Sequence, residues 1–185
     1  MKKFLKAVGI IFLILIGFVI LIQFVGFNIG SVHIGKAKND LRAEKINTFE
    51  NSNFQNEILN SDKLTCINIW ATWCVPCVEE MPELNKIKAE FESKNVQFAS
   101  LSIDTDSAKL QKFIDSKKFH FEDLTLVNVK YKNAILNFLE KKPLNFENTT
   151  QAIPLTYLVK NGKVIHKIEG GTDATELRKL INENL

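Results

Sequence analysis

The sequence predicts an α/β fold: an open mixed β-sheet flanked by helices, with an inserted β-α unit, after an N-terminal transmembrane helix. Three observations predict this class. Short apolar runs of strand length alternate along the chain with segments whose apolar residues recur at helical spacing. An Asn-Gly pair between two late runs is typical of a β-hairpin, and a long apolar run lies near the N-terminus. The 185 residues suffice for one well-buried domain.

The apolar run from Ala7 to Phe27 has the length of a membrane-crossing helix, about 20 residues. Lys2, Lys3 and Lys6 precede it, and this positive charge keeps the N-terminus in the cytoplasm and sends the remaining chain across. A cleaved signal peptide is the alternative, but the run exceeds a typical h-region and no A-x-A cleavage site follows it. We therefore expect a single-pass protein of the cytoplasmic membrane, with its domain on the extracytoplasmic (periplasmic) side.

A polar stretch after the span divides the chain into residues 1–27 as membrane anchor, 28–44 as tether and 45–185 as the folded domain. The chain carries 24 Lys and Arg against 21 Asp and Glu, and the three lysines before the span account for the difference. The exported part is therefore electrically balanced. Nucleic-acid binding needs a basic face, so we expect no nucleic acid among the partners.

The first predicted strands lie on either side of a helix. Thr65–Trp70 and Val96–Ile103 are short apolar runs typical of buried central strands. Between them the apolar residues recur at helical spacing, which predicts a helix that begins at a cysteine pair and crosses back over the sheet. These residues are Val78, Met81, Leu84, Ile87 and Phe91.

The next segments predict a second helix and the inserted β-α unit. Asp106 is placed to cap the second helix, whose apolar face is Leu110, Phe113 and Ile114. Asp123–Asn128 then has the composition of a strand, and Tyr131–Glu140 has the spacing of a helix.

The last elements are a hairpin and a helix. Leu155–Val159 and Val164–Ile168 flank Asn161-Gly162, the strongest short hairpin signal in the chain. Asp173 with Glu176 predicts a capping box at the start of the final helix. Its apolar residues are Leu177, Leu180 and Ile181.

The stretch NIWATWCVPC places Cys74 and Cys77 three residues apart, directly after the first strand. No second C-x-x-C or C-x-x-H lies within zinc-ligand spacing, so we expect no metal site. Three cysteines are also too few for the disulfide framework of a small secreted module. The third, Cys66, lies in the middle of a strand and is expected to be a buried core residue. The pair is therefore interpreted as redox-active, with an inert disulfide as the alternative.

Helix geometry gives the two thiols of the pair different roles. A cysteine at a helix N-terminus faces unpaired N–H groups and the positive end of the helix dipole, which lowers its pKa below the free value of about 8.5. Cys74 occupies that position and is expected to attack the substrate. Cys77, one turn further in, is expected to be shielded from solvent and to resolve the mixed disulfide. Pro76 suits the first helical turn because its missing N–H would be unpaired there anyway.

Three features together resemble the thioredoxin superfamily: the stretch WATWCVPC, Pro82 five residues after the second cysteine, and the stretch IPLTY before the Asn-Gly hairpin. The membrane anchor, the Glu-Met-Pro of CVEEMPEL and the extra β-α unit resemble, within it, the TlpA and ResA type of anchored thiol:disulfide oxidoreductase. This group includes cytochrome c maturation reductases. The resemblance covers the chain from Lys45 to Leu185 and implies a thioredoxin-like domain there.

The resemblance implies further site residues. Ile153-Pro154 is implied to be a cis peptide that faces the cysteines, with the backbone of Ile153 free to pair with an extended substrate segment. Trp73 is expected to lie over the attacking sulfur and to shape substrate contact. Glu80 matches the acidic position of the family's CxxCxxE pattern, where a carboxylate near thiols relays a proton; a plain surface charge is the alternative. Asn68 stands where thioredoxins proper carry a buried aspartate, and a neutral amide cannot accept that proton.

We therefore expect a membrane-tethered thiol-disulfide oxidoreductase that reduces extracytoplasmic protein disulfides, in cytochrome c maturation or more generally. Its redox group is the Cys74–Cys77 pair, no further cofactor is expected, and a transmembrane electron donor would return it to the reduced state. The alternative is a non-catalytic binding module of the same fold that holds a partner protein. The stretch from Lys142 to Ala152 is longer than the resemblance predicts, and forms either a lip that selects the partner or a tolerated surface insertion.

Overall fold

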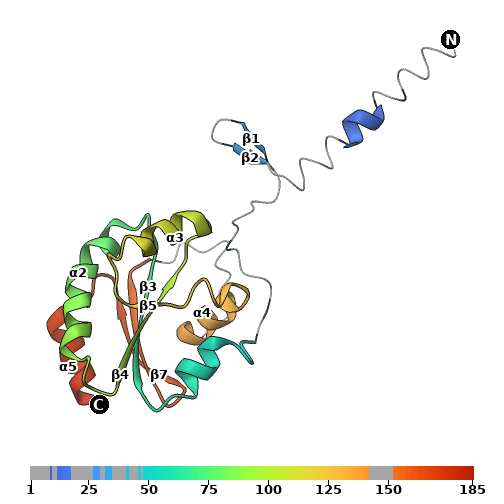
Figure 1. Ribbon diagram of the computed structural model, residues 1–185. Coiled ribbons are helices and arrows are strands. Elements are labelled where there is room, and N and C mark those ends of the chain that lie inside the picture. Colours follow the sequence, from blue (N-terminus) through green and yellow to red (C-terminus); the bar gives the residue numbers. More distant parts are fainter. Residues whose placement is uncertain are drawn as a thin grey trace, which may run out of the picture. The chain divides into compact units, whose positions relative to one another are not determined.

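The computed structural model describes residues 9, 12–17, 27–29, 32–34, 41, 46, 48–141 and 152–185. The chain divides into two compact units, Met1–Asp40 and Leu41–Leu185 (Figure 1). The expected insertion from Lys142 to Ala152 lies outside the described residues except for Ala152 itself.

The first unit contains two short strands where the sequence predicts only a tether. β1 (Phe27–Ile29) pairs antiparallel with β2 (Val32–Ile34). Most of the expected membrane span, residues 7–27, lies outside the described part of the chain, in which residues 12–17 are helical. Within the described ranges, the structure holds no helix with the length and apolarity that a bilayer crossing requires.

The second unit is built on a five-stranded mixed sheet of order β5-β4-β3-β6-β7. β3 (Leu64–Trp70) lies at its centre, parallel to β4 (Val96–Ser102) and antiparallel to β6 (Leu155–Lys160). The edges are β5 (Glu122–Asp123), parallel to β4, and β7 (Lys163–Glu169), antiparallel to β6. All seven residues of β3 are buried, which agrees with the prediction of an apolar central strand.

Helices cover both faces of this sheet (Figure 1). On one face lie α2 (Val75–Glu90) and α5 (Ala174–Glu183), which pack on side chains that include Cys66. α3 (Ser107–Asp115) contributes Leu110 to the cluster around Trp70. On the other face lie α4 (Lys132–Glu140), preceded by a 3-10 turn η2 (Val129–Tyr131), and a π-helical turn η1 (Phe54–Leu59) that the sequence does not predict. The predicted open mixed sheet with helices on both faces is confirmed.

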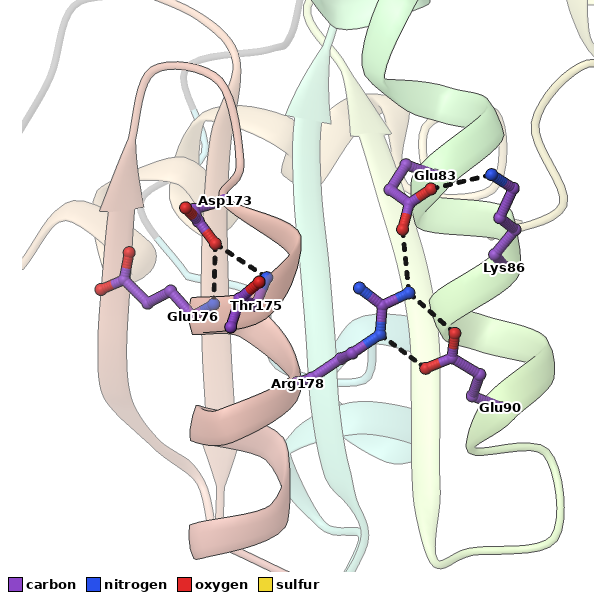
Figure 2. Close-up of polar contacts among 7 residues, drawn as sticks. All are labelled: Glu83, Lys86, Glu90, Asp173, Thr175, Glu176 and Arg178. Carbon is purple, nitrogen blue, oxygen red and sulfur yellow. Dashed lines mark hydrogen bonds and ion pairs between the residues drawn. The ribbon is translucent and has the colours of Figure 1, made fainter.

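The predicted helix caps and the predicted hairpin are present. The Asp106 carboxylate accepts from the backbone N–H groups of Ala108 and Lys109 at the start of α3. The Asp173 carboxylate likewise accepts from the backbone N–H groups of Thr175 and Glu176 at the start of α5 (Figure 2). Between β6 and β7, Asn161 and Gly162 both have positive φ, 52° and 68°, as a two-residue type I′ turn requires.

The predicted strand Asp123–Asn128 is wrong beyond its first residue. β5 comprises only Glu122 and Asp123, and the chain then turns. The reason lies in Asp123 itself, whose carboxylate accepts from Thr125 N at 3.0 Å, from Leu126 N at 3.2 Å and from Thr125 Oγ1 at 3.0 Å. These local bonds give the backbone an alternative to the strand ladder, so the apolar composition of the segment does not decide its conformation.

Candidate active site

The cysteine pair lies at the N-terminus of α2, directly after the sheet's central strand. Cys74 is the N-cap residue, and its Sγ accepts a hydrogen bond from the backbone N–H of Cys77 at 3.3 Å. The two sulfur atoms form a disulfide of 2.03 Å. Pro76 occupies the first turn, as predicted. Among the described residues, no three His, Cys, Asp or Glu side chains gather as metal ligands.

The loop before β6 faces the disulfide. The Ile153–Pro154 peptide is cis, as the resemblance implied, and Pro154 is buried. The carbonyl oxygen of Ile153 lies 3.8 Å from Cys74 Sγ. A disulfide sulfur carries no hydrogen, so this is a contact in the oxidised protein and becomes available as a hydrogen bond when Cys74 is a thiol. The structure thus brings together two segments that are 79 residues apart in the chain.

Exposed apolar side chains flank a nearly buried disulfide. Trp73 and Val75, on either side of Cys74, are each 64% exposed, whereas Cys74 is 5% and Cys77 1% exposed. Trp70, by contrast, lies in the core, where its ring packs on Phe113 at 4.9 Å and on Phe119 at 5.9 Å between centroids. A partner that approaches the sulfur of Cys74 therefore meets the indole of Trp73 and the side chain of Val75.

Glu80, three residues after Cys77 in α2, takes part in a partly buried hydrogen-bond network. Its Oε1 accepts from Asn68 Nδ2 at 3.0 Å, and its Oε2 accepts from Thr172 N at 2.8 Å. Asn68 Nδ2 also donates to Thr156 Oγ1 at 3.1 Å, and that hydroxyl lies 3.0 Å from Thr172 Oγ1. Glu80 is thus held between β3, β6 and the loop before α5, which does not fit a plain solvated helix glutamate.

Burial raises the pKa of the Glu80 carboxyl above its ordinary value, while hydrogen bonds from Thr172 and Asn68 oppose this shift. A carboxyl of raised pKa holds a proton more readily than a solvated glutamate, which is the property that proton transfer requires. The thiol of Cys66 is free and fully buried, two residues before Asn68. Burial, and to a smaller extent the Glu80 carboxylate, raises the pKa of that thiol, so Cys66 is held protonated and unreactive.

Sequence reasoning missed a second polar group beside the cysteines, formed by Thr72 and Asp104. Thr72 donates to the Asp104 carboxylate from its backbone N–H and from its hydroxyl, both at 2.7 Å. The signal was present in the pattern: Thr72 follows the predicted strand Thr65–Trp70 by two positions, and Asp104 follows the predicted strand Val96–Ile103 by one. Adjacent parallel strands end at the same edge of a sheet, so two such residues meet there.

The comparisons with known proteins agree with this geometry. Residues 38–181 match the Redoxin family model. Thiol-disulfide oxidoreductase ResA of Oceanobacillus iheyensis is 30% identical over 63% of this chain and 55% of the relative. Thioredoxin-like protein YneN of Bacillus subtilis is 29% identical over 60% of this chain and 58% of the relative. The chain therefore spans little more than half the length of these curated relatives.

Solved structures share the fold at lower identity. A thioredoxin-family thiol:disulfide interchange protein from Chlorobium tepidum covers 70% of this chain with 83% of its own, at 15% identity and a TM-score of 0.55. StoA from Bacillus subtilis covers 65% of this chain with 83% of its own, at 20% identity and a TM-score of 0.50. These likenesses support the thioredoxin-like architecture, and the family match extends over most of the chain. This chain belongs to the Redoxin family.

Proposed function

We propose that the protein is a membrane-tethered thiol-disulfide oxidoreductase that reduces extracytoplasmic protein disulfides through Cys74 and Cys77. The observation that carries this proposal is the position of Cys74 as the N-cap of α2, with its sulfur 3.3 Å from the Cys77 backbone nitrogen and within a disulfide to Cys77. Backbone N–H groups and the helix dipole stabilise a thiolate at that position, and the thiolate is the species that attacks a disulfide.

The exchange proceeds in two balanced steps. In the reduced protein the Cys74 thiolate attacks one sulfur of a substrate disulfide, which forms a mixed disulfide and releases one substrate thiolate. Cys77, as its thiolate, then attacks Cys74 Sγ; the mixed disulfide breaks, the Cys74–Cys77 bond forms and the second substrate thiolate leaves. Two electrons pass to the substrate, whose thiolates take up protons. Glu80 is assigned the role of accepting the Cys77 proton, since its raised pKa and position in α2 suit proton transfer.

The substrate-binding role is assigned to Trp73, Ile153 and Pro154. Trp73 is exposed beside Cys74 and offers a large apolar surface with an N–H donor. The cis Ile153–Pro154 segment lies against the same sulfur and presents backbone to an extended partner chain. This arrangement supports a protein substrate, since a peptide segment can contact both sides of the sulfur at once. Cytochrome c maturation clients and general clients both satisfy this chemistry.

The membrane part of the proposal rests on the sequence. The apolar run at residues 7–27 and the lysines before it support an anchor with residues 28–44 as tether and the domain, residues 45–185, outside the cytoplasm. A protein that reduces disulfides in an oxidising compartment needs electrons from across the membrane, so we include a transmembrane electron donor among the partners. Retention in the membrane pellet after alkaline carbonate extraction supports the anchor, and release into the supernatant refutes it.

The activity is tested with the full-length protein purified in detergent and reduced before use. It is mixed with insulin or a glutathionylated peptide, and the product thiols and the oxidation of Cys74 and Cys77 are counted. We expect transfer of two electrons for each protein molecule. A chain that binds a partner but exchanges no thiols would support the non-catalytic binding module instead. The exposed Trp73 and Val75 serve either function, so only turnover separates the two.

A further inference from the structure

Asp104 is a buried carboxylate outside the cysteine helix that the mechanism above does not use. It follows the end of β4 and is only 3% exposed. Its Oδ2 accepts from Thr72 N at 2.7 Å and from Ser102 Oγ at 2.6 Å, and its Oδ1 accepts from Thr72 Oγ1 at 2.7 Å. Two of the three donors thus belong to one residue. A buried carboxylate with such short bonds is an acceptor of fixed position.

The register of the sheet explains why Thr72 and Asp104 meet. Trp70 pairs with Ser102 at the last position of the β3–β4 ladder, and Ile103 N donates to the Trp70 carbonyl at 2.9 Å. Two residues beyond this pair, the chains leave the sheet side by side as Thr72 and Asp104. The contact therefore joins the two chain segments just beyond the ends of β3 and β4, at the point where the chain leaves β3 toward the cysteine helix.

Thr72 controls the turn that presents the attacking sulfur. Cys74 N donates to the Ala71 carbonyl at 3.1 Å, so the residues from Ala71 to Cys74 form one turn with Thr72 inside it. The Asp104 carboxylate fixes both the backbone N–H and the side-chain rotamer of Thr72. Through that turn it sets where Trp73 lies on the surface and where Cys74 Sγ lies relative to Cys77 N and the Ile153 carbonyl.

Asp104 is itself held by the segment inserted between β4 and β6. Lys132, the first residue of α4, donates from Nζ to the Asp104 carbonyl at 3.1 Å, and its side chain is buried. Ser102 N donates to Thr125 Oγ1 at 2.7 Å, and Ser102 Oγ accepts from Asp104 N at 2.9 Å. The inserted segment thus holds the backbone at Ser102 and Asp104, and the Ser102 hydroxyl holds the Asp104 carboxylate, which in turn positions Thr72.

We propose that Asp104 is a positioning residue of the thiol-disulfide exchange, acting through Thr72 on Trp73 and Cys74. This inference rests on the proposed function, because the group that is positioned is the attacking sulfur. Loss of the contact lets the turn from Ala71 to Cys74 sample other conformations, and a reacting atom that is displaced by about 1 Å loses up to about a hundredfold in rate. The Thr72 hydroxyl contributes one of the two bonds, so its removal alone has a smaller effect than removal of the carboxylate.

The test compares four substitutions of full-length protein in the same detergent. Thr72→Val removes the hydroxyl donor and keeps the size of the side chain. Thr72→Ser keeps the donor and serves as the rescue variant. The matched control is Thr65→Val, the same chemical change in β3, because the buried Thr65 hydroxyl has no hydrogen-bond partner among the described residues. Asp104→Leu is a fourth variant, which removes both acceptor oxygens and keeps a side chain of similar size.

Two rates are measured: alkylation of Cys74 by iodoacetamide in the reduced protein, and kcat/KM for reduction of a glutathionylated peptide. We expect Thr72→Val to lower both rates by about tenfold and Asp104→Leu to lower them by more. Both rates of Thr72→Ser should stay within about twofold of those of the unchanged protein, because this variant keeps the hydroxyl donor. The rates of Thr65→Val should do the same, because the Thr65 hydroxyl has no hydrogen bond to lose among the described residues. The unfolding transition of each variant is recorded alongside.

The outcomes separate the inference from the proposed function. If the unchanged protein is active and the rates of Thr72→Val and Asp104→Leu equal its own, the positioning role is overturned. Equal losses in Thr72→Val and Thr65→Val, in proportion to lost stability, overturn it as well, since they mark a purely structural effect. If the unchanged protein reduces no disulfide, the proposed function fails, and the alkylation rate of Cys74 still decides whether Asp104 positions that sulfur.

Discussion

Cys74 and Cys77 differ in what surrounds their sulfur atoms. Cys74 Sγ accepts a backbone N–H bond at the helix end and is the more exposed of the two. We therefore expect Cys77→Ser to accumulate mixed disulfides through Cys74, and Cys74→Ser to accumulate few or none. Non-reducing gels of membranes from cells that produce each variant measure this, with the double Cys74→Ser/Cys77→Ser variant as the blank. Equal trapping by the two single variants would reverse the assignment.

Glu80 predicts a specific pH dependence of stability. Its pKa is raised in the folded protein, so the folded state binds the proton more tightly than the unfolded chain, in which a Glu has a pKa of about 4.3. The resulting stabilisation is present below that pH and is lost as pH rises through the raised folded pKa. We expect Glu80→Gln to lack this loss, so the variant gains stability relative to the unchanged protein as pH rises from about 4 toward neutral.

Urea unfolding at several pH values measures this difference, and Glu79→Gln on the same helix is the matched control. The geometry allows the Gln side chain to bond well: its amide oxygen can accept from Thr172 N while its NH2 donates to a reversed Asn68 amide. Such a reversal exchanges the two ends of the Asn68 amide, so Nδ2 then takes the buried place in which Oδ1 has no partner among the described residues. A stability difference that does not change with pH would contradict the assigned pKa direction.

Only part of the candidate site was predictable from sequence. Cys74, Cys77 and Trp73 lie in one motif whose helix end can be recognised locally, and Ile153 and Pro154 follow from the resemblance. The bond between Glu80 and Asn68 was not predicted, although both residues were named, because it depends on how α2 crosses over β3. Asp104 was missed because an isolated Asp after a strand is common; its partner becomes visible only through the strand register.

At the scale of elements, an ion-pair cluster joins the cysteine helix to the C-terminal helix. Arg178 of α5 donates to Glu90 through Nε at 2.6 Å and Nη2 at 2.7 Å, and Nη2 also donates to Glu83 at 2.8 Å (Figure 2). These bonds lower the pKa of both carboxyls on α2. The two-pronged contact to Glu90 matches the planar geometry of the guanidinium, which a lysine cannot reproduce.

We expect Arg178→Gln to lower the midpoint of thermal unfolding, and the loss to shrink in 1 M NaCl (about 3 Å Debye length) because the pairs are partly exposed and screened by salt. Lys179→Gln is the control on the same helix, since the ion pair of Lys179 is long, at 3.9 Å, and lies within α5, with Glu183. Differential scanning calorimetry at low and high salt measures both variants. A loss of equal size at both salt concentrations would show that packing of the Arg178 stem, rather than its charge, joins the helices.

Element boundaries were predictable where side chains act locally and not where competing contacts decide. The Asn161-Gly162 turn and the Asp106 and Asp173 caps depend on one or two residues, and each was predicted. The segment after Asp123 has the apolar composition of a strand, but the Asp123 side chain folds it into a turn. The apolar composition of a segment indicates that its side chains are buried. It does not show whether its backbone N–H groups pair in a sheet, because a carboxylate at the start of the segment can bind them instead.

At the scale of the whole molecule, the direction of electron flow follows from the charges around the pair. Val75 and Pro76 add no positive charge beside Cys74, and an ionised Glu80 disfavours a second negative charge on the thiols. Both effects weaken thiolate stabilisation and favour the disulfide, so we expect the reduced protein to act as an electron donor. We expect a reduction potential nearer that of thioredoxin, about −270 mV, than that of DsbA, about −120 mV.

Equilibration of the full-length protein with dithiothreitol redox buffers measures this potential, and a thiolate titration of Cys74 accompanies it. A value above about −180 mV, that of protein disulfide isomerase, together with a Cys74 pKa well below neutral, would make the protein an oxidant or isomerase. In that case the reductase direction is wrong, while the exchange chemistry of the pair remains.

Because the Cys66 thiol is fully buried, the number of thiols that a reagent labels in the native protein reports the redox state of the Cys74–Cys77 pair. A maleimide reagent applied to the native protein is expected to reach the Cys74 thiol when the pair is reduced and no thiol when the pair is joined, because Cys77 is 1% and Cys66 0% exposed. Unfolding in the presence of the reagent then adds one label to the oxidised protein, at Cys66, and two to the reduced protein, at Cys66 and Cys77. The label count before and after unfolding therefore distinguishes oxidised from reduced protein in a single gel, without any substitution.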